Sequence, residues 1–187
     1  MTAWSTSPPP HLRVEDWVPR PGIVIDGRYR IEAVVGIGTM GAVVAARHLV
    51  LDRRIAIKFL RPDRAVDPTA VERFRQEASA ASRIRTDHVV RIHDIGVTDE
   101  GLPFMAMELL EGIDLEKLTQ RGPLSIQLAA DCVLQAAEAL AEAHVEGIVH
   151  RDIKPSNLFL TRRPDGSRWL KVLDFGISKL APERGGD

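Results

Sequence analysis

A glycine-rich run between two short apolar segments restricts the fold of this chain more than any other feature. Gly36, Gly38 and Gly41 form a G-x-G-x-x-G pattern, in which the missing side chains let backbone N–H groups approach phosphate oxygens closely. A dinucleotide-binding fold would need a helix directly after these glycines. Here residues 42–48 form a short apolar segment, followed by a turn-like stretch and a third apolar segment, residues 55–60. The pattern favours a β-hairpin that covers phosphates over a nicotinamide site, although a tight structural turn would also account for the glycines.

The first half of the chain contains short apolar and partly alternating segments, which are typical of β-strands. Three segments in succession predict an antiparallel meander, and two more follow a helix: residues 29–36, 42–48, 55–60, 89–97 and 102–110. Asp67 can cap that helix, and Pro68 suits its first position. The apolar residues of the helix recur at helical spacing: Val71, Phe74, Ala78, Ala81 and Ile84. We therefore expect five strands with one inserted helix.

The second half of the chain has mainly helical patterns and one hairpin. Asp114 can cap a short helix that ends at Gly122, and Ser125 begins a longer helix that ends near Gly147. The expected apolar face of the longer helix is Ala129, Val133, Ala136, Ala137 and Leu140. Residues 157–160 and 169–176 predict a hairpin, because Asp165-Gly166 between them is a turn signal.

Composition and charge exclude several classes of protein. The hydrophobic share of 44% and the charged share of 27% are ordinary for a globular protein, and a net charge of −1 gives no general attraction to nucleic acid. Cys132 is the single cysteine, so we expect core packing and neither an internal disulfide nor a zinc site. No run of about 18 apolar residues predicts a membrane segment, and no secretory signal is recognisable, so the expected location is cytoplasmic. Residues 1–26 are rich in proline and are expected to form a disordered tail.

Two residues of opposite charge fall on the predicted elements of the first half. Lys58 lies in the third strand and, by alternation, on the same face as Ala56. Glu77 lies on the predicted helix, at the border of its apolar face. Each has an ordinary explanation, which is a solvated strand position for the lysine and a pair with Arg73 for the glutamate. Alternatively, Glu77 pairs with Lys58 and holds the ammonium group toward a phosphate.

A loop just before the predicted hairpin, residues 150–157 (HRDIKPSN), combines side chains that packing alone would not require. Asn157 ends this loop and Asp174 ends the second strand, so two oxygen ligands come from adjacent strands. A hard cation such as Mg²⁺ prefers carboxylate and carbonyl oxygens. Asp152 would then be available to accept a proton from an attacking hydroxyl group. Taken singly, each acid also fits a turn residue or a helix cap.

Four motifs, in this order and spacing, resemble the signature set of eukaryotic-type protein kinases. The motifs are Gly36-x-Gly38-x-x-Gly41-x-Val43, Ile55-Ala56-Ile57-Lys58, His150-Arg151-Asp152-x-x-x-x-Asn157 and Asp174-Phe175-Gly176. Lys154 and Pro155 resemble the serine/threonine class, and the run around them looks most like bacterial members. The resemblance spans roughly residues 27–179.

This resemblance implies an α+β, protein-kinase-like bilobal fold. Residues 27–110 would form the small lobe, with a five-stranded antiparallel sheet and one helix, and residues 111–187 would form the first part of the helical large lobe. Family members continue through further helices after the Asp-Phe-Gly motif. We therefore expect a truncated kinase with impaired activity on its own, whose incomplete large lobe is covered by a partner or by self-association.

The resemblance also assigns chemical roles. ATP and Mg²⁺ are the implied cofactors, and a serine or threonine of a protein is the implied substrate. Asp152 is the implied catalytic base and Lys154 the group that neutralises the transferring phosphoryl group. Asn157 and Asp174 are implied to hold Mg²⁺.

Other residues are implied to bind the nucleotide. Lys58 would contact the α- and β-phosphates while it pairs with Glu77. The residues implied to cover the phosphates are Gly36, Ile37, Gly38, Thr39, Met40 and Gly41. The residues implied to contact adenine or ribose are Val35, Val43, Ala56, Met107, Glu108, Leu110, Asp114 and Phe159. His150 would be structural and would pack under Phe175.

Two other functions fit the same motifs. One is a catalytically weak module that binds ATP or a partner, and the other is a small-molecule kinase with related loops. Arg151 and Lys154-Pro155 argue against the small-molecule kinase. Phosphate transfer to a protein, compared with nucleotide binding alone, distinguishes a protein kinase from a binding module.

Overall fold

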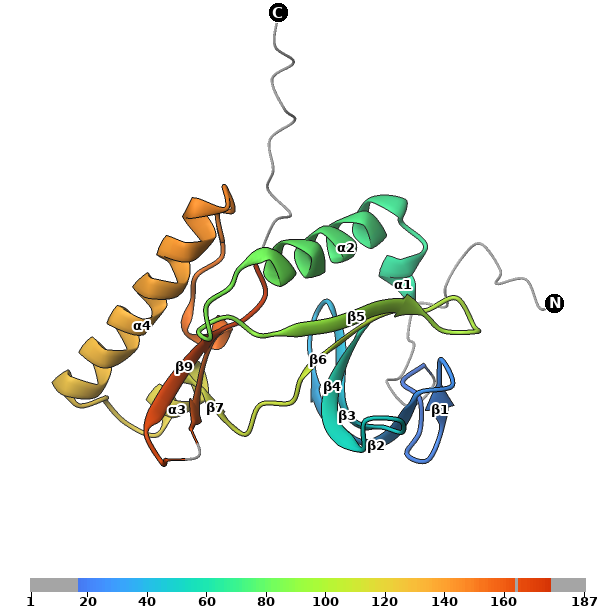
Figure 1. The fold of residues 1–187 in the computed structure, drawn as a ribbon, viewed down its shortest axis with the longest axis horizontal. Coiled ribbons are helices and arrows are strands. Elements are labelled where there is room, and N and C mark those ends of the chain that lie inside the picture. Colours follow the sequence, from blue (N-terminus) through green and yellow to red (C-terminus); the bar gives the residue numbers. More distant parts are fainter. Residues whose placement is uncertain (1–16, 164, 176–187) are drawn as a thin grey trace, which may run out of the picture. The chain divides into compact units, whose positions relative to one another are not determined.

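The computed structural model describes residues 17–163 and 165–175, which belong to two compact units. The first unit comprises Met1–Arg75 with Ile92–Leu109, and the second comprises Gln76–Arg91 with Leu110–Asp187. Each unit has its own β-sheet (Figure 1). The expected tail before residue 17, and Gly176 of the fourth motif, lie outside the described residues.

An antiparallel six-stranded sheet makes up most of the first unit, in the order β1-β2-β3-β4-β6-β5 (Figure 1). The strands are β1 Val24–Ile25, β2 Tyr29–Ile37, β3 Gly41–His48, β4 Arg53–Leu60, β5 Ile92–Val97 and β6 Pro103–Glu108. The helices are α1 Pro62–Ala65 and α2 Pro68–Arg83, and the C-terminal half of α2 belongs to the second unit. Asp67 caps α2 as predicted, because its Oδ1 accepts a hydrogen bond from Thr69 N at 2.9 Å. The meander and the five strands are confirmed, whereas β1 and α1 are additional.

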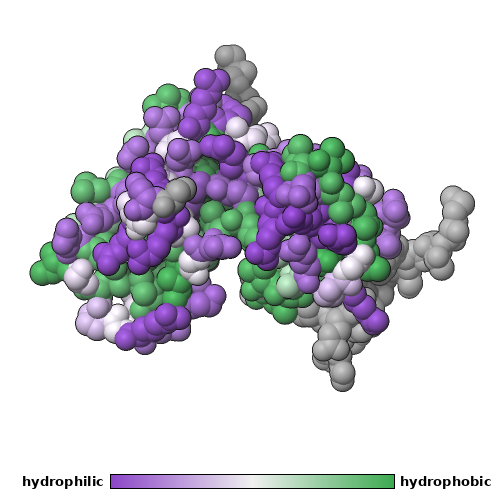
Figure 2. All heavy atoms as spheres, turned by 60° about the horizontal axis from the view of Figure 1, so that its bottom comes forward, coloured by the Kyte–Doolittle hydropathy of each residue, from purple (hydrophilic) through white to green (hydrophobic). Residues whose placement is uncertain are grey.

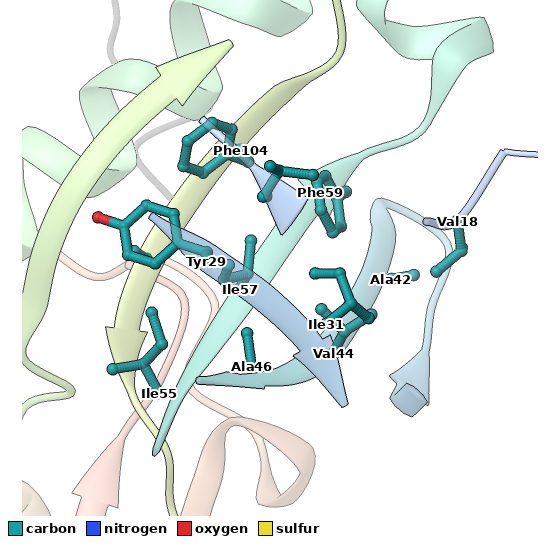
Figure 3. Packing of buried hydrophobic residues seen from close by; sticks show 12 residues of the cluster. Val18, Tyr29, Ile31, Ala42, Val44, Ala46, Ile55, Ile57, Phe59 and Phe104 are labelled. Carbon is teal, nitrogen blue, oxygen red and sulfur yellow. The ribbon is translucent and has the colours of Figure 1, made fainter. Parts of the chain in front are cut away.

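Alternate residues of the strands form a hydrophobic core on one face of this sheet (Figure 3). The buried members are Val18, Ile25, Tyr29, Ile31, Ala42, Val44, Ala46, Ile55, Ile57, Phe59, Phe104 and Ala106. Trp17, which precedes β1 in the chain, also packs against this core. The expectation of a disordered tail through residue 26 is therefore wrong for residues 17–26, because burial of Val18 and Ile25 and the pairing of β1 hold them to the sheet.

A hydrogen bond between distant strands shows that the sheet is strongly curled. Tyr29 of β2 donates its hydroxyl to Asp94 Oδ2 of β5 at 2.9 Å, although β3, β4 and β6 lie between these strands in the sheet order. Arg28 also pairs with Asp94, at 2.7 Å. Burial and the neighbouring Asp94 carboxylate raise the pKa of Tyr29 to about 12. The phenol therefore stays protonated and keeps donating across the physiological pH range.

The second unit contains a three-stranded sheet and two helices. The strands lie in the order β7 Gly112–Asp114, β8 Leu158–Arg162 and β9 Arg168–Val172, and the helices are α3 Leu115–Gln120 and α4 Ile126–Val145. The predicted hairpin is confirmed as β8 and β9, and β7 is an additional strand. Asp114 and Ser125 cap α3 and α4 as predicted, since their side chains accept from Lys117 N and Leu128 N. A short 3-10 turn, Pro155–Asn157, precedes β8.

The buried face of α4 differs from the predicted one. Its buried residues are Cys132, Ala136, Ala139 and Ala143, whereas Val133 is 67% exposed and Ala137 is exposed. Much of the helix surface is alanine, leucine or valine, so residue spacing alone cannot choose between neighbouring apolar stripes. Packing against β9 determines which residues of α4 are buried, and the expected burial of Cys132 is confirmed.

Figure 2 shows hydrophobic side chains on the surface among hydrophilic ones. Within the described ranges, no helix has both the length and the hydropathy to cross a bilayer.

Candidate active site

One face of the first unit's sheet carries several of the predicted nucleotide contacts. Residues that pair directly across antiparallel strands point to the same side of a sheet. Val43 pairs with Gly36 and with Lys58, and Ala56 pairs with Met107. The alternate residues of β3 and β4 form the core in Figure 3, so these side chains lie on the opposite face. The register therefore brings together four of the predicted contacts and the first glycine of the run.

Lys58 is buried on this face, with only 8% of its surface exposed. A solvated strand position therefore does not explain it. Burial of an ammonium group costs free energy unless charged or polar partners compensate, so a buried lysine is a candidate functional residue. Glu77, its predicted partner, is half-buried on the part of α2 that belongs to the second unit. The pairing of the two residues stays a prediction.

The glycine run forms the connection between β2 and β3. Gly38 N donates to Gly41 O at 2.8 Å, which closes a tight turn. A Cβ at Gly41 would lie 1.8 Å from Phe59 O, so the fold itself requires glycine there. Gly36 and Gly38 have negative φ angles, and a Cβ on either would meet no atom closer than 3.9 Å. The close approach of β4 therefore explains Gly41, whereas Gly36 and Gly38 have no such structural requirement.

This difference predicts opposite outcomes for three substitutions. Gly41→Ala should lower the free energy of unfolding by about 1–3 kcal/mol or more, because the new Cβ collides with the backbone of β4. Gly36→Ala and Gly38→Ala should leave stability unchanged or raise it by about 0.4–1 kcal/mol, while both weaken nucleotide binding. Chemical denaturation of the three variants tests the stability difference, and nucleotide titration tests the binding. Equal destabilisation by all three would contradict a ligand-related role for Gly36 and Gly38.

The other predicted residues of this loop lie at the surface. Val35 is displaced from the regular β2–β3 pairing by a bulge, and its side chain is exposed. Ile37 and Met40 are large exposed hydrophobic residues, and Thr39 is exposed at the turn. Exposed apolar side chains beside this turn are unfavourable without a ligand, so their arrangement is compatible with the predicted cover over phosphates.

In the second unit, His150 is a fixed structural residue of the loop that contains Asp152. Its ring lies 4.7 Å from the ring of Phe175, which confirms the predicted packing. Nδ1 accepts from Asp152 N at 3.3 Å, and Nε2 donates to Leu173 O at 2.9 Å. Acceptance at Nδ1 requires the neutral ring, protonated at Nε2, and burial lowers the pKa of His150 in the same direction. His150 therefore holds the loop in place and does not carry a mobile proton.

Asp152 is half-exposed, and its carboxylate is surrounded by donors. Lys154 Nζ lies 2.8 Å from Asp152 Oδ2. Asn157 Nδ2 donates to the backbone oxygen of Asp152 at 2.9 Å and to Oδ2 at 3.1 Å. The hydrogen bond from Lys154 is the largest cause that lowers the pKa of Asp152, and the same contact raises the pKa of Lys154. At neutral pH the pair is ionised, so Asp152 accepts hydrogen bonds and has an oriented carboxylate.

Asn157 and Asp174 were expected on neighbouring strands, but Asn157 ends the 3-10 turn before β8, and Asp174 follows the last residue of β9 by two positions. The pairing of β8 with β9 still brings the two positions to the same end of the hairpin. Leu158 pairs with Val172, and Leu173 N donates to Asn157 O at 2.9 Å, directly before Asp174. Because the amide nitrogen of Asn157 donates to Asp152, the side-chain oxygen is the atom suited to a cation. An amide oxygen and a carboxylate fit Mg²⁺, which usually keeps several waters and phosphate oxygens as further ligands. The described residues contain no group of three His, Cys, Asp or Glu side chains arranged as a metal site.

Two further predicted contacts face each other in the second unit. Asp114 of β7 pairs with Phe159 of β8, which is half-buried. Asp114 is committed to α3, since its carboxylate accepts from Lys117 N at 2.8 Å and pairs with Lys117 Nζ at 2.8 Å. Burial alone would raise the pKa of Asp114, but these contacts lower it. The cap is therefore established, and contact with a ribose stays a prediction, as do the predicted backbone contacts of Glu108 and Leu110.

The sequence pattern did not single out Lys171, which is buried in β9 and donates to Val89 O at 3.4 Å. A charged residue between Leu170 and Val172, both buried, was the available signal. The pattern also missed Trp169 and His88, whose rings stack with their centroids 3.9 Å apart. These contacts join residues about eighty positions apart, so local patterns do not reveal them.

The family model and the most similar curated proteins indicate the same family. The protein kinase domain family matches residues 29–185. Serine/threonine-protein kinase pkn3 of Myxococcus xanthus is 39% identical over 170 residues, which are 90% of this chain and 31% of the relative. PknH of Mycobacterium bovis is 40% identical over 158 residues, which are 84% of this chain and 26% of that protein. The chain thus spans about a third or less of these relatives.

A solved structure supports the same relationship. The kinase domain of Mycobacterium tuberculosis PknI superimposes with a TM-score of 0.73 at 32% identity, over 86% of this chain and 64% of that one. The expected α+β, kinase-like fold is therefore confirmed, with a β-rich small lobe and part of a helical lobe. From its sequence, its fold and the residues of its loops, the chain belongs to the protein kinase domain family.

Proposed function

We propose that this chain forms the nucleotide-binding and catalytic part of a serine/threonine protein kinase. The observation that supports this most directly is the arrangement around Asp152. A fixed loop there holds an ionised carboxylate next to Lys154 and Asn157, and Asp174 follows Leu173, whose N–H is bonded to Asn157 O. The curated relatives named above are serine/threonine-protein kinases. The proposed substrate is accordingly a serine or threonine hydroxyl of a protein.

The proposed mechanism gives each group of this loop one task. Asp152 orients the attacking hydroxyl and accepts its proton as the oxygen–phosphorus bond forms. Lys154 stabilises negative charge on the phosphoryl oxygens during transfer from ATP, and ADP leaves. Asn157 and Asp174 would hold Mg²⁺, which neutralises phosphate charge when it is bound. His150 keeps the backbone of Asp152 in position through its hydrogen bonds to Asp152 N and Leu173 O.

The proposed nucleotide contacts are assigned within each unit by itself. In the first unit these are the glycine turn, the buried Lys58 and the sheet face that carries Val43, Ala56 and Met107. In the second unit, Phe159 and Glu77 are the proposed contributors to adenine binding and to the orientation of Lys58. We also propose small-lobe limits of 27–110 and a cytoplasmic location, where ATP is available and a buried free cysteine such as Cys132 stays reduced.

The test is a phosphotransfer assay with the protein in its full natural length. Peptides with serine, threonine or tyrosine as the single hydroxyl residue are incubated with Mg·ATP labelled in the γ-phosphate. Transfer to serine or threonine peptides at about 1–100 s⁻¹ is expected. Nucleotide binding without transfer would indicate a binding module, and transfer to aminoglycosides but not to peptides would indicate a small-molecule kinase. The same assay on residues 1–187 alone tests the prediction of impaired activity.

A further inference from the structure

A short segment after α2 is bound to β9 from Trp169 to Val172. We call Asp87–Val90 the anchor segment; it belongs to the second unit, as β9 does. Val172 N donates to His88 O at 2.7 Å, and Val90 N donates to Val172 O at 3.3 Å. These two bonds form a parallel bridge between Val89 and Val172. The backbone of the anchor segment thus extends the strand pairing at the end of β9.

Side chains add three further hydrogen bonds between the anchor segment and β9. Trp169 Nε1 donates to Asp87 O at 3.1 Å, and Lys171 Nζ donates to Val89 O at 3.4 Å. His88 Nδ1 donates to Leu170 O at 2.8 Å, because a carbonyl oxygen can only accept. The residues of β9 from Trp169 to Val172 therefore all contact the anchor segment. β9 is already paired with β8, so its contacts to the anchor segment are additional to those that form the hairpin.

Trp169 is the centre of this attachment. Its ring stacks on the His88 ring with centroids 3.9 Å apart and an interplanar angle of 22°. The Arg163 guanidinium lies over the Trp169 ring, 3.1 Å from its centroid. Two groups this close to one ring cannot share a side, so Trp169 is held between His88 and Arg163. His88 is fully enclosed and also has Glu138 of α4 near Nε2, at 3.5 Å.

The attachment joins two elements that carry proposed site residues. On one side, the anchor segment follows α2 by a few residues, and Glu77 lies on that helix. On the other side, β9 ends at Val172, two residues before Asp174. Leu173, between them, is hydrogen-bonded to Asn157 O. A shift of β9 relative to the anchor segment would therefore move the proposed metal ligand Asp174 relative to the helix of Glu77.

We propose that Trp169 is a positioning residue, which fixes β9 to the anchor segment and thereby keeps Asp174 in the geometry for the metal. This inference rests on the proposed function. Trp169 itself touches no substrate or cofactor. Its effect is transmitted through the backbone of β9, with His88 as the partner on the anchor segment. The loss of Trp169 should therefore weaken metal-dependent steps more than metal-free nucleotide binding.

Two variants and one control test this proposal in the full-length protein. Trp169→Leu removes the ring and the Nε1 donor, whereas Trp169→Phe keeps an aromatic ring against His88 and removes only the donor. Asp99→Asn changes an exposed polar residue between β5 and β6 of the first unit and serves as the control. Trp169→Phe also preserves the test if Trp169→Leu fails to fold.

The first measurement is hydrogen exchange without ligand, at the amides of Val90 and Val172. Exchange at both should become about 2- to 30-fold faster in Trp169→Leu, the range usual for residues that couple two elements. The increase should be smaller in Trp169→Phe and absent in the control. Unchanged exchange in Trp169→Leu would overturn the attachment, whatever the enzyme activity.

The second measurement separates positioning from a merely structural role. In Trp169→Leu, the affinity for Mn²⁺ in the presence of ATP should fall by about 2- to 30-fold, and the Mg²⁺ concentration for half-maximal transfer should rise by the same factor. Nucleotide affinity in a metal chelator should stay the same. Faster exchange with unchanged metal dependence would overturn the positioning role alone. A wild-type protein that binds no Mg·ATP would overturn the proposed function and the positioning role together.

Discussion

The variant Asp152→Asn is expected to lose about 10²- to 10⁴-fold in the rate of phosphotransfer, the usual scale for a general base, while it keeps most of its affinity for Mg·ATP. Asparagine has the same shape, and its amide oxygen can still accept the hydrogen bond from Asn157 Nδ2. The loop should therefore remain in place. A carboxamide, however, cannot take up the proton of the attacking hydroxyl group at neutral pH. The expected signature is a lower kcat with little change in the KM for Mg·ATP.

The pH dependence of the phosphotransfer rate tests the same substitution in a second way. The hydrogen bond from Lys154 lowers the pKa of Asp152, so the carboxylate stays ionised through neutral pH and below the usual carboxyl range. The wild-type rate should therefore fall only at acid pH, where Asp152 becomes protonated and can no longer accept a proton. That acid limb should be missing from the residual rate of Asp152→Asn. Asp131→Asn, on the exposed surface of α4, is the matched control and should behave as wild type. A normal rate in Asp152→Asn would assign the base to another residue.

Much of the fold was predictable because its signals are local. The partly alternating runs that became β2, β3 and β4 have one face in the core of Figure 3, which is the condition that produces alternation. Asp67, Asp114 and Ser125 each accept a hydrogen bond from an amide two or three residues later, so the helix starts are encoded within a single turn. The Asp165-Gly166 turn is equally local, since Ser167 N donates to Asp165 Oδ1 and Gly166 has a positive φ angle.

Features that depend on distant partners were not predictable. β1 and β7 contain two and three residues, too few for a period to appear, and each exists because a neighbouring strand pairs with it. Trp17 and Val18 follow a proline-rich stretch but dock on a core built from later strands. The predicted buried face of α4 was wrong for the same reason, because packing against β9 determines which residues of the helix are buried. In each case, a tertiary contact overrides or supplements a weak local preference.

The candidate site shows the same division. Within the second unit, the motif from His150 to Asn157 predicted a loop whose members contact one another, and His150, Asp152, Lys154 and Asn157 do so. Within the first unit, strand alternation placed Lys58 and Ala56 on one face, and the register adds Val43 and Met107 to it. The attachment of β9 by Trp169 and His88 was not visible, since a stacked pair of rings has no sequence period.

Replacement of Lys58 by methionine should remove most of the stabilisation that Mg·ATP gives to the protein. A ligand at about 100 times its Kd stabilises the folded state by about 2.7 kcal/mol, which corresponds to a rise in Tm of about 5–10 °C for a chain of this size. Lys58 is the buried cation on the proposed nucleotide face. Methionine has a similar length and no charge, so Lys58→Met removes the attraction to phosphate without leaving a large cavity. The rise in Tm with Mg·ATP should therefore be small in the variant.

The response of Lys58→Met to Mg·ATP distinguishes a binding role from a structural one. Lys58→Met also removes the predicted pairing with Glu77, and loss of one partner of a buried ion pair lowers stability, so each variant's response to Mg·ATP is measured against its own ligand-free Tm. A lysine that only supports the fold would give a lower Tm in the absence of nucleotide and an unchanged rise in Tm in its presence. Lys117→Met is the control, because Lys117 is an exposed lysine whose described partner is Asp114 of the α3 cap. An equal Mg·ATP response in Lys58→Met and Lys117→Met would exclude Lys58 from the nucleotide site.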